Sequence, residues 1–223
     1  MRLLSTKILS PQFRDRLIQI GCSVVEYPFI KISPLKFELQ KIENALIFTS
    51  QNAIKQAFKS KNISGQIRNK NCYCVGEKTK SLLEENDQKV IKMSQNASDL
   101  AQFIVKNCKN ESFSFFCGMQ RRPEIELLLG QHNIPLKIHE LYETLVTPKH
   151  FESPFDGVLF FSPSAVNSYF LENTWPEDTY GFCIGPTTAG TLKNHTMNVL
   201  EAKNPSENYL ISVIYQHYTQ HYA

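Results

Sequence analysis

Short apolar segments recur along the whole chain, and each is followed by a turn and then by helically spaced apolar positions. The apolar segments are rich in β-branched and aromatic residues and too short for helices, so they predict strands. The predicted strands are Arg2–Thr6, Ser23–Tyr27, Ala45–Thr49, Cys72–Val75, Lys89–Met93, Ser112–Phe116, Leu136–Tyr142, Val158–Phe161, Phe182–Ile184 and Val199–Ala202.

Helices are predicted after most of these strands, because a capping residue, a Ser-Pro pair or a Gly-Pro pair marks where each begins. They run from Ser10 to Gly21, from Ser50 to Phe58, from Glu77 to Asn86, from Ser98 to Lys106, from Glu124 to Gly130, onward from Ser162 and from Gly185, and from Asn204 to Tyr218. The pattern also indicates a short helix over Leu35–Ile42 and a polar loop over Lys59–Lys70. Alternating strands and helices are typical of an α/β fold with doubly wound parallel sheets.

The sequence contains an internal duplication. ALIFTSQNAIKQAF, which begins at Ala45, parallels VLFFSPSAVNSYF, which begins at Val158. CYCVGEKTKSLL likewise parallels GFCIGPTTAGTL, and NASDLAQFI parallels NPSENYLISVI. Three matching blocks in the same order predict two similar α/β domains.

Two connectivities fit the duplication. The chain either forms tandem halves, about 1–108 and 109–223, or crosses between domains at the Pro-rich passages 28–34 and 144–154. In the second case the middle of the chain is one domain, and its two ends form the other. The pattern alone favours neither connectivity.

The composition of the chain argues against a nucleic-acid-binding protein and against a membrane protein. The hydrophobic content of 42% is enough for packed cores, and the net charge of +3 lacks the basic stripe of a nucleic-acid binder. No apolar run reaches the ~20 residues of a membrane span, and the N-terminal residues are typical of a first strand rather than a signal peptide. The six cysteines show no metal-type spacing and indicate free thiols in a reducing cytoplasm. We therefore expect a cytoplasmic protein without membrane or nucleic-acid partners.

Hydroxyl-bearing and glycine turns follow the duplicated strands. Because the carboxyl ends of parallel strands meet at one edge, and helix starts expose N–H groups, such turns can hold anions. They also act as plain helix caps. The candidate binding residues are Ser50, Asn52, Gly76, Thr79, Ser162, Ser164, Thr187 and Thr188.

The ordered motifs FTSxNA, CVGxxT, NASDL, LYET, FFSPSAV, CIGPTT and NPSENYL give the sequence a family resemblance over essentially its whole length. In this order and spacing the chain resembles uroporphyrinogen-III synthase. The resemblance implies the crossed connectivity, with one domain of residues 1–33 plus 149–223 and a second of residues 36–143. A two-stranded linker, residues 28–36 and 143–150, would join them beside an active-site cleft.

The resemblance also implies a reaction in porphyrin and heme biosynthesis. The substrate would be hydroxymethylbilane, a linear tetrapyrrole polycarboxylate, which a lyase closes to uroporphyrinogen III with loss of water and inversion of ring D. The family pattern makes Tyr142 the catalytic candidate, as proton donor to the leaving hydroxyl. The family often has Arg where this chain has Lys7, so we expect a point charge there rather than a bidentate fork.

No cofactor or metal is expected for this chemistry. His217 and His221 have helical spacing, but they lie in a Tyr-rich final segment, and we expect a frayed surface there rather than a metal site. The sequence has no G-x-G-x-x-G and no Walker lysine loop, which argues against a nucleotide enzyme. The alternative function is a non-catalytic two-lobed binding protein for an anionic small molecule, and in either case we expect a monomer.

Overall fold

The computed structural model describes residues 1–36 and 41–221 and divides the chain into two compact units. The terminal unit comprises Met1–Lys31 with Leu145–Ala223, and the central unit comprises Ile32–Thr144. Both ends of the chain thus belong to one unit, and the chain passes between the units twice. The linker ranges 28–36 and 143–150 stay a prediction.

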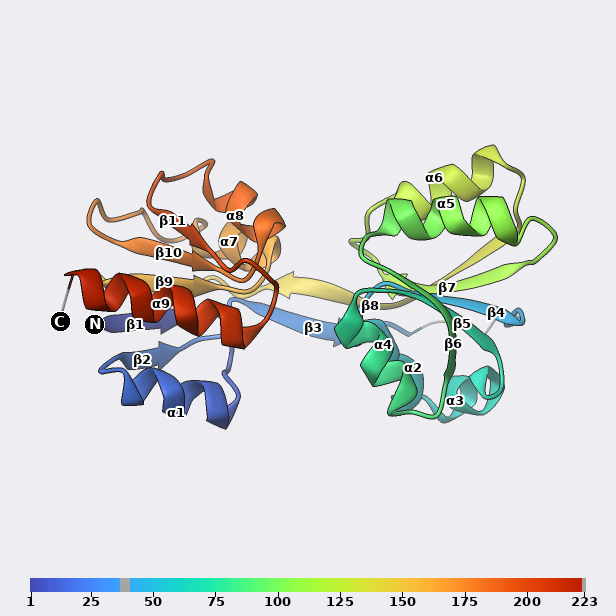
Figure 1. Cartoon of the computed structure of the whole chain (residues 1–223), viewed down its shortest axis with the longest axis horizontal. Helices are drawn as coiled ribbons and strands as arrows, with labels where there is room; N and C mark the ends of the chain where they lie inside the picture. The colour runs from blue at the N-terminus through green and yellow to red at the C-terminus, as the bar shows by residue number, and fades with distance from the viewer. Residues whose placement is uncertain (37–40, 222–223) are drawn as a thin grey trace. The chain divides into compact units, whose positions relative to one another are not determined.

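The terminal unit is built on a five-stranded sheet in the order β11-β10-β9-β1-β2, with every neighbouring pair parallel (Figure 1). Residues of α1 and α9 pack in one apolar cluster, and residues of α7 and α8 pack in the other. The elements are β1 (Arg2–Ser5), α1 (Pro11–Gln19), β2 (Ser23–Glu26), β9 (Gly157–Phe160), α7 (Pro163–Tyr169), β10 (Tyr180–Cys183), α8 (Pro186–Leu192), β11 (Val199–Glu201) and α9 (Glu207–His221).

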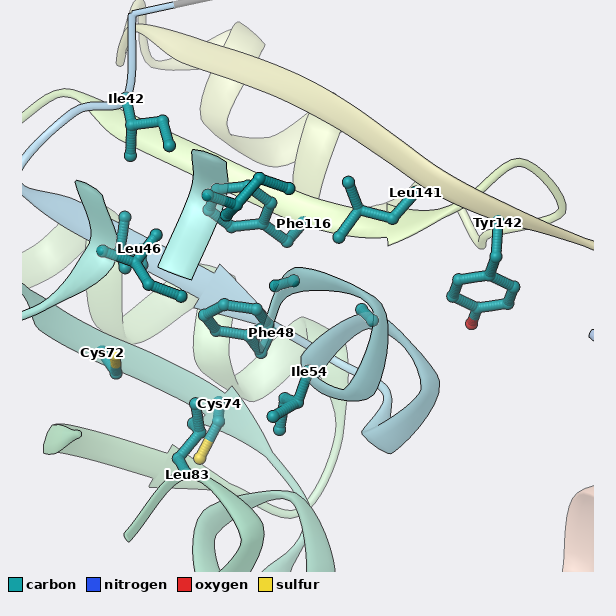
Figure 2. Close-up of a cluster of buried hydrophobic side chains, with 14 residues drawn as sticks. Ile42, Leu46, Phe48, Ile54, Cys72, Cys74, Leu83, Phe116, Leu141 and Tyr142 are labelled. Carbon is teal, nitrogen blue, oxygen red and sulfur yellow. The ribbon is translucent and has the colours of Figure 1, made fainter. Parts of the chain in front are cut away.

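The central unit is built on a six-stranded sheet in the order β3-β8-β7-β4-β5-β6, in which the pairs from β8 to β6 are parallel. The helices α2, α3 and α4 contribute to one cluster (Figure 2), and α5 and α6 contribute to the other. The elements are β4 (Ala45–Phe48), α2 (Gln51–Lys59), α3 (Lys61–Ile67), β5 (Asn71–Val75), α4 (Glu77–Glu84), β6 (Lys89–Ser94), α5 (Ala97–Asn107), β7 (Phe113–Gly118) and α6 (Glu124–Gln131), with β3 (Ile30–Pro34) and β8 (Leu136–Val146), which both extend past the boundary of the unit.

The structure confirms the predicted α/β class with doubly wound, mainly parallel sheets. The predicted loop over Lys59–Lys70 is wrong, because α3 lies there. Ile63 and Ile67 are one helical turn apart and fully buried, and their burial stabilises a helix in an otherwise polar segment. Part of the helix predicted over Leu35–Ile42 lies outside the described residues, and the described residues at its two ends are not helical.

The predicted frayed surface at His217 is also wrong. The side chain is 5% exposed, and its ring packs 4.2 Å from that of Tyr180 and 5.5 Å from that of Phe182, measured between centroids. Both partners belong to β10, so this side of α9 is part of the core. Within the described part of the chain, no helix is long and apolar enough to cross a membrane.

The surroundings of a buried histidine in the central unit favour its neutral form. His139 is 3% exposed, stacks on Phe116, and lies 3.1 Å through Nε2 from the Ser114 hydroxyl. Ser114 accepts the backbone N–H of Glu43 at 3.0 Å, which leaves its proton for the histidine nitrogen. Burial lowers the pKa of His139, Lys137 lowers it further, and Glu43 partly opposes them.

This burial predicts acid sensitivity. Because the pKa of His139 is lower in the folded protein, the unfolded chain takes up the proton first as the pH falls. The stabilising contribution is therefore complete above about pH 6.5, the unfolded value, and is lost as the pH drops towards the folded pKa. Urea unfolding between about pH 5 and pH 8 should show a shallower acid decline in His139→Gln than in the native chain.

The matched control for this measurement is His132→Gln, because His132 is an exposed histidine of the same unit. The unfolding free energy of the His132→Gln variant should show the same pH dependence as that of the native chain. Parallel curves for the native chain and His139→Gln would contradict the prediction.

Candidate active site

In the terminal unit, three neighbouring strands end at one edge of the sheet. The strands lie in the order β10-β9-β1 and are parallel, so the turns that follow them share the carboxyl edge. Lys7 follows β1, Ser162 follows β9, and Thr187 lies in the first turn of α8 after β10. In open parallel sheets this edge is where ligands bind.

Ser162 begins α7 as its cap. The residue is extended, with φ of −160°, and its hydroxyl oxygen accepts the backbone N–H of Ala165 at 3.2 Å. Pro163 occupies the first helical turn, where a missing N–H has no cost. The capping bond leaves the hydroxyl proton of Ser162 able to donate outward. Ser164, in the same turn, is partly exposed.

The two threonines of the next turn differ in exposure. Thr187 is exposed, whereas Thr188 is 3% exposed and packs inside the unit. Gly185 begins α8 without a side-chain cap. Of the two threonines, Thr187 is therefore the one whose hydroxyl is accessible to a ligand, whereas Thr188 belongs to the packed interior.

The charge of Lys7 is already paired. Its ammonium lies 2.8 Å from a carboxylate oxygen of Glu207 and 4.1 Å from the ring centre of Phe161. The other carboxylate oxygen of Glu207 accepts the Ser10 hydroxyl at 2.8 Å. The sequence predicted Glu207 only as part of a helix cap, and its pairing with Lys7 was not predicted. The available signal was its position, because an acidic residue in the first turn of a helix is a usual partner for nearby cations.

In the central unit, the strands β5, β4, β7 and β8 lie side by side and are parallel. Ser50 follows β4, Gly76 follows β5, Gly118 ends β7, and Tyr142 lies in β8 opposite Gly118. The sequence-predicted residues Ser50, Asn52 and Tyr142 are thus brought together at this edge. Figure 2 shows Tyr142 at one end of the buried cluster.

Tyr142 is nearly buried and hydrogen-bonded at its phenol. The side chain is 8% exposed, and its oxygen lies 2.9 Å from the Ser50 hydroxyl. Ser50 also caps α2 by accepting the backbone N–H of Asn52 at 3.1 Å. Burial raises the pKa of Tyr142, and hydrogen bonding by Ser50 and by the Asn52 side chain partly opposes that rise. The phenol is therefore protonated at neutral pH and can act as a proton donor.

Gly118 leaves room for the Tyr142 ring. A Cβ atom on Gly118 would lie 2.7 Å from two ring carbons and 3.0 Å from the phenol oxygen. The register between β7 and β8 shifts at this point, from Cys117 opposite Glu140 to Gly118 opposite Tyr142. Bulges of this kind re-aim side chains and are common beside active sites. Gly118 was not among the predicted site residues, and its position at the end of an apolar strand was the one signal that could have indicated it.

Gly76 and Thr79 form the turn after β5. Gly76 has φ of +85°, a left-handed conformation that favours glycine, and its carbonyl accepts the backbone N–H of Thr79 at 3.1 Å. Thr79 is 5% exposed, so its side chain supports the turn from inside. Glu77 places a negative charge in the first turn of α4. An incoming carboxylate would meet that charge here.

Arg121, in the turn after β7, is also fully paired with carboxylates. Its guanidinium bonds to both oxygens of Glu126 and, at 2.5 Å, to Glu140. These partners raise the pKa of Arg121 further above its ordinary range. Like Lys7, this cation is neutralised within its own unit.

The comparisons with known proteins agree with this architecture. The family model described as "Uroporphyrinogen-III synthase HemD" matches residues 11–212. The crystal structure of uroporphyrinogen-III synthetase from Helicobacter pylori 26695 matches with a TM-score of 0.75 at 19% identity, covering 97% of this chain and 100% of that one. A mutant uroporphyrinogen III synthase from the extremely thermophilic bacterium Thermus thermophilus matches with a TM-score of 0.67 at 11% identity, covering 99% of each chain. No individually curated protein matches the sequence significantly.

The two solved structures show the same fold, and the family model spans most of the sequence. The resemblance of the ordered motifs is thereby confirmed by an independent comparison. The chain belongs to the uroporphyrinogen-III synthase family.

Proposed function

We propose that this lyase of porphyrin biosynthesis uses the Tyr142 phenol as the proton donor in closing hydroxymethylbilane to uroporphyrinogen III. The hydroxyl-bearing turns of each unit would bind the substrate's carboxylates. The observation that carries the proposal is the nearly buried, protonated phenol, held 2.9 Å from Ser50 at the carboxyl edge of the central sheet.

The substrate is a flexible polyanion, because each of its pyrroles carries an acetate and a propionate. Neutral donors suit it well: backbone N–H groups and hydroxyls at helix starts bind carboxylates through charge-assisted hydrogen bonds. The donors we assign to this task are Ser162, Ser164 and Thr187 in the terminal unit and Asn52 in the central unit. Lys7 would contribute by sharing its charge between Glu207 and the substrate.

The chemical step begins with departure of the hydroxyl from the terminal hydroxymethyl group. The carbon–oxygen electron pair leaves with the oxygen, the phenol proton of Tyr142 joins it, and water departs. The remaining carbocation is stabilised by the pyrrole nitrogen and is attacked by the substituted carbon of the far pyrrole. In the spiro intermediate, the bond between this carbon and the methylene bridge to the neighbouring pyrrole then breaks, and that methylene bonds to the unsubstituted α-carbon of the same far pyrrole. The proton lost from that α-carbon restores the phenol.

Binding has to select one conformation of the linear chain. Without the protein the linear tetrapyrrole closes directly and ring D is not inverted. The main task of the protein is therefore to hold the reacting carbons of the substrate in the geometry that inverts ring D. Carboxylate contacts spread over several turns fix such a fold of the substrate better than one strong contact would.

We also propose a cytoplasmic monomer that binds no nucleic acid and needs no cofactor. All six cysteines are buried free thiols, as expected of a reducing compartment. The net charge of +3 is modest for a nucleic-acid binder. Sedimentation of the purified chain tests the monomer, and a concentration-dependent dimer would contradict it.

Removal of the Tyr142 hydroxyl should slow the reaction without unfolding the protein. In Tyr142→Phe the ring still fills its place in the cluster, so we expect a kcat lowered on the order of tenfold to a thousandfold and a nearly unchanged KM. Steady-state assays with hydroxymethylbilane, alongside thermal unfolding, provide the measurement. An unchanged kcat would remove Tyr142 from the mechanism.

The product isomer tests the reaction itself. Incubation of the chain with hydroxymethylbilane, followed by oxidation and chromatography of the porphyrins, should give the type III isomer. Type I product alone would overturn the assignment and favour a non-catalytic binding protein.

The Thr187 hydroxyl should matter for binding rather than for folding. Thr187→Val removes an exposed donor from the first turn of α8, and loss of one hydrogen bond to a charged group should raise KM about tenfold. Thr191→Val is the matched control, because that hydroxyl lies one turn further on and bonds to the Thr187 carbonyl. Equal KM values for the two variants would contradict a binding role for Thr187.

A further inference from the structure

We propose that Ser50 and Gly118 together form a seat for Tyr142. In this seat the Ser50 hydroxyl donates to the phenol oxygen, and Gly118 provides the space in which the ring lies. The phenol's own proton is then not used in this bond and is available to the substrate. The inference rests on the proposed role of Tyr142 as proton donor, and it makes Ser50 a positioning residue rather than a carboxylate ligand.

The hydrogen-bond inventory of Ser50 supports this direction. A backbone N–H can only donate, so the 3.1 Å bond from Asn52 uses a lone pair of the Ser50 oxygen. The hydroxyl proton of Ser50 remains, and the Tyr142 oxygen lies 2.9 Å away. When the Ser50 hydroxyl is the donor and the phenol oxygen the acceptor of this hydrogen bond, the phenol proton takes no part in it.

A donor at this position also stabilises the state that follows proton transfer. Once Tyr142 has given up its proton, a nearly buried phenolate is left, and burial disfavours that charge. Hydrogen bonds from Ser50 and from the Asn52 side chain favour the charged form, which agrees with the lowering that both exert on the pKa of Tyr142. The seat therefore orients the Tyr142 phenol before proton transfer and stabilises the phenolate after it.

The backbone fixes where the ring lies. The Met119 N–H donates to the Tyr142 carbonyl at 2.8 Å, and the bulge places Tyr142 rather than Leu141 opposite Gly118. Any side chain at Gly118 would come within 2.7 Å of the ring. A carbon contact this short forces the ring to move, so glycine is required for the observed position of the phenol.

The equivalent residue of the other unit shows that capping alone does not explain Ser50. Ser162 caps α7 by accepting the N–H of Ala165, three residues on, at 3.2 Å, whereas Ser50 accepts the N–H of Asn52, two residues on. The duplication gives both units the cap, whereas the bond to Tyr142 belongs to Ser50.

Loss of the Ser50 donor should change the behaviour of Tyr142. Ser50→Ala should lower kcat about tenfold, because a hydrogen bond to a developing phenolate is lost, with KM changed far less. The pKa of Tyr142 should rise. Ultraviolet difference titration measures that pKa without turnover, as the native curve minus the Tyr142→Phe curve, repeated in the Ser50→Ala background.

Two companions to Ser50→Ala separate this effect from the loss of a helix cap. Ser50→Thr keeps a hydroxyl and should restore both kcat and the titration. Asn96→Ala removes the cap of α5 in the same unit, where Asn96 accepts the Asp99 N–H at 2.8 Å, and should lower stability without moving the titration. A titration that moves as far in Asn96→Ala as in Ser50→Ala would overturn the proposal.

A double-mutant cycle tests Gly118. If Gly118 acts only through Tyr142, Gly118→Ala lowers kcat, and Gly118→Ala with Tyr142→Phe is no slower than Tyr142→Phe alone. Multiplied losses in the double variant would overturn the seat. Thermal unfolding confirms that each variant is folded.

The outcomes for the seat and for the proposed function are distinct. If Tyr142→Phe keeps the native kcat, the proton-donor role fails, and the titration in Ser50→Ala still decides whether the bond exists. If Tyr142→Phe is slow while Ser50→Ala changes neither kcat nor titration, the donor role stands and the seat is wrong.

Discussion

The structure depends on the backbone N–H groups at the start of each helix that follows a strand, which need partners and lie at the carboxyl edge of a parallel sheet. In both units one neighbouring helix has a serine cap and the next begins at a glycine without a side-chain cap, as Ser50 with Gly76 and Ser162 with Gly185 show. The serine-capped starts are partly satisfied from within. The glycine starts lack a side-chain acceptor, so each duplicated pair combines one helix start that is capped by a side chain with one that is not.

The fold was predictable because local pattern and global architecture agree. Buried strands appear as apolar runs, and Ser-Pro or Gly-Pro pairs indicate helix starts. The errors arose where packing overrides composition: α3 depends on the buried pair Ile63 and Ile67 inside a polar segment, and α9 buries His217 against β10. In both places a few tertiary contacts decide the structure, and a window of sequence does not contain them. The choice between tandem and crossed connectivity has the same origin, since either fits every local signal.

The site was only partly predictable, for a more specific reason. The caps at Ser50 and Ser162 follow from residue type and position. The Ser50–Tyr142 bond depends on the bulge in β8, because a regular ladder would continue from Cys117 and Glu140 to place Leu141 opposite Gly118. A shift of one residue exchanges the two faces of a strand. The alternation of apolar and polar residues along the strand therefore does not predict whether Leu141 or Tyr142 lies opposite Gly118. The role of Gly118 can be inferred only once the register of the two strands is known.

The pairing of the cations is the reason we assign substrate binding to neutral donors. Lys7 is paired with Glu207, and Arg121 with Glu126 and Glu140, so neither presents a bare charge. The reaction leaves every carboxylate of the substrate intact, so contacts with these groups stabilise substrate, transition state and product alike. Such uniform binding does not accelerate the chemical step, and in excess it slows product release. Many weak hydrogen bonds can fix the conformation of the linear substrate while remaining reversible, and we propose that the acceleration comes from the phenol of Tyr142, the group whose bonding would change.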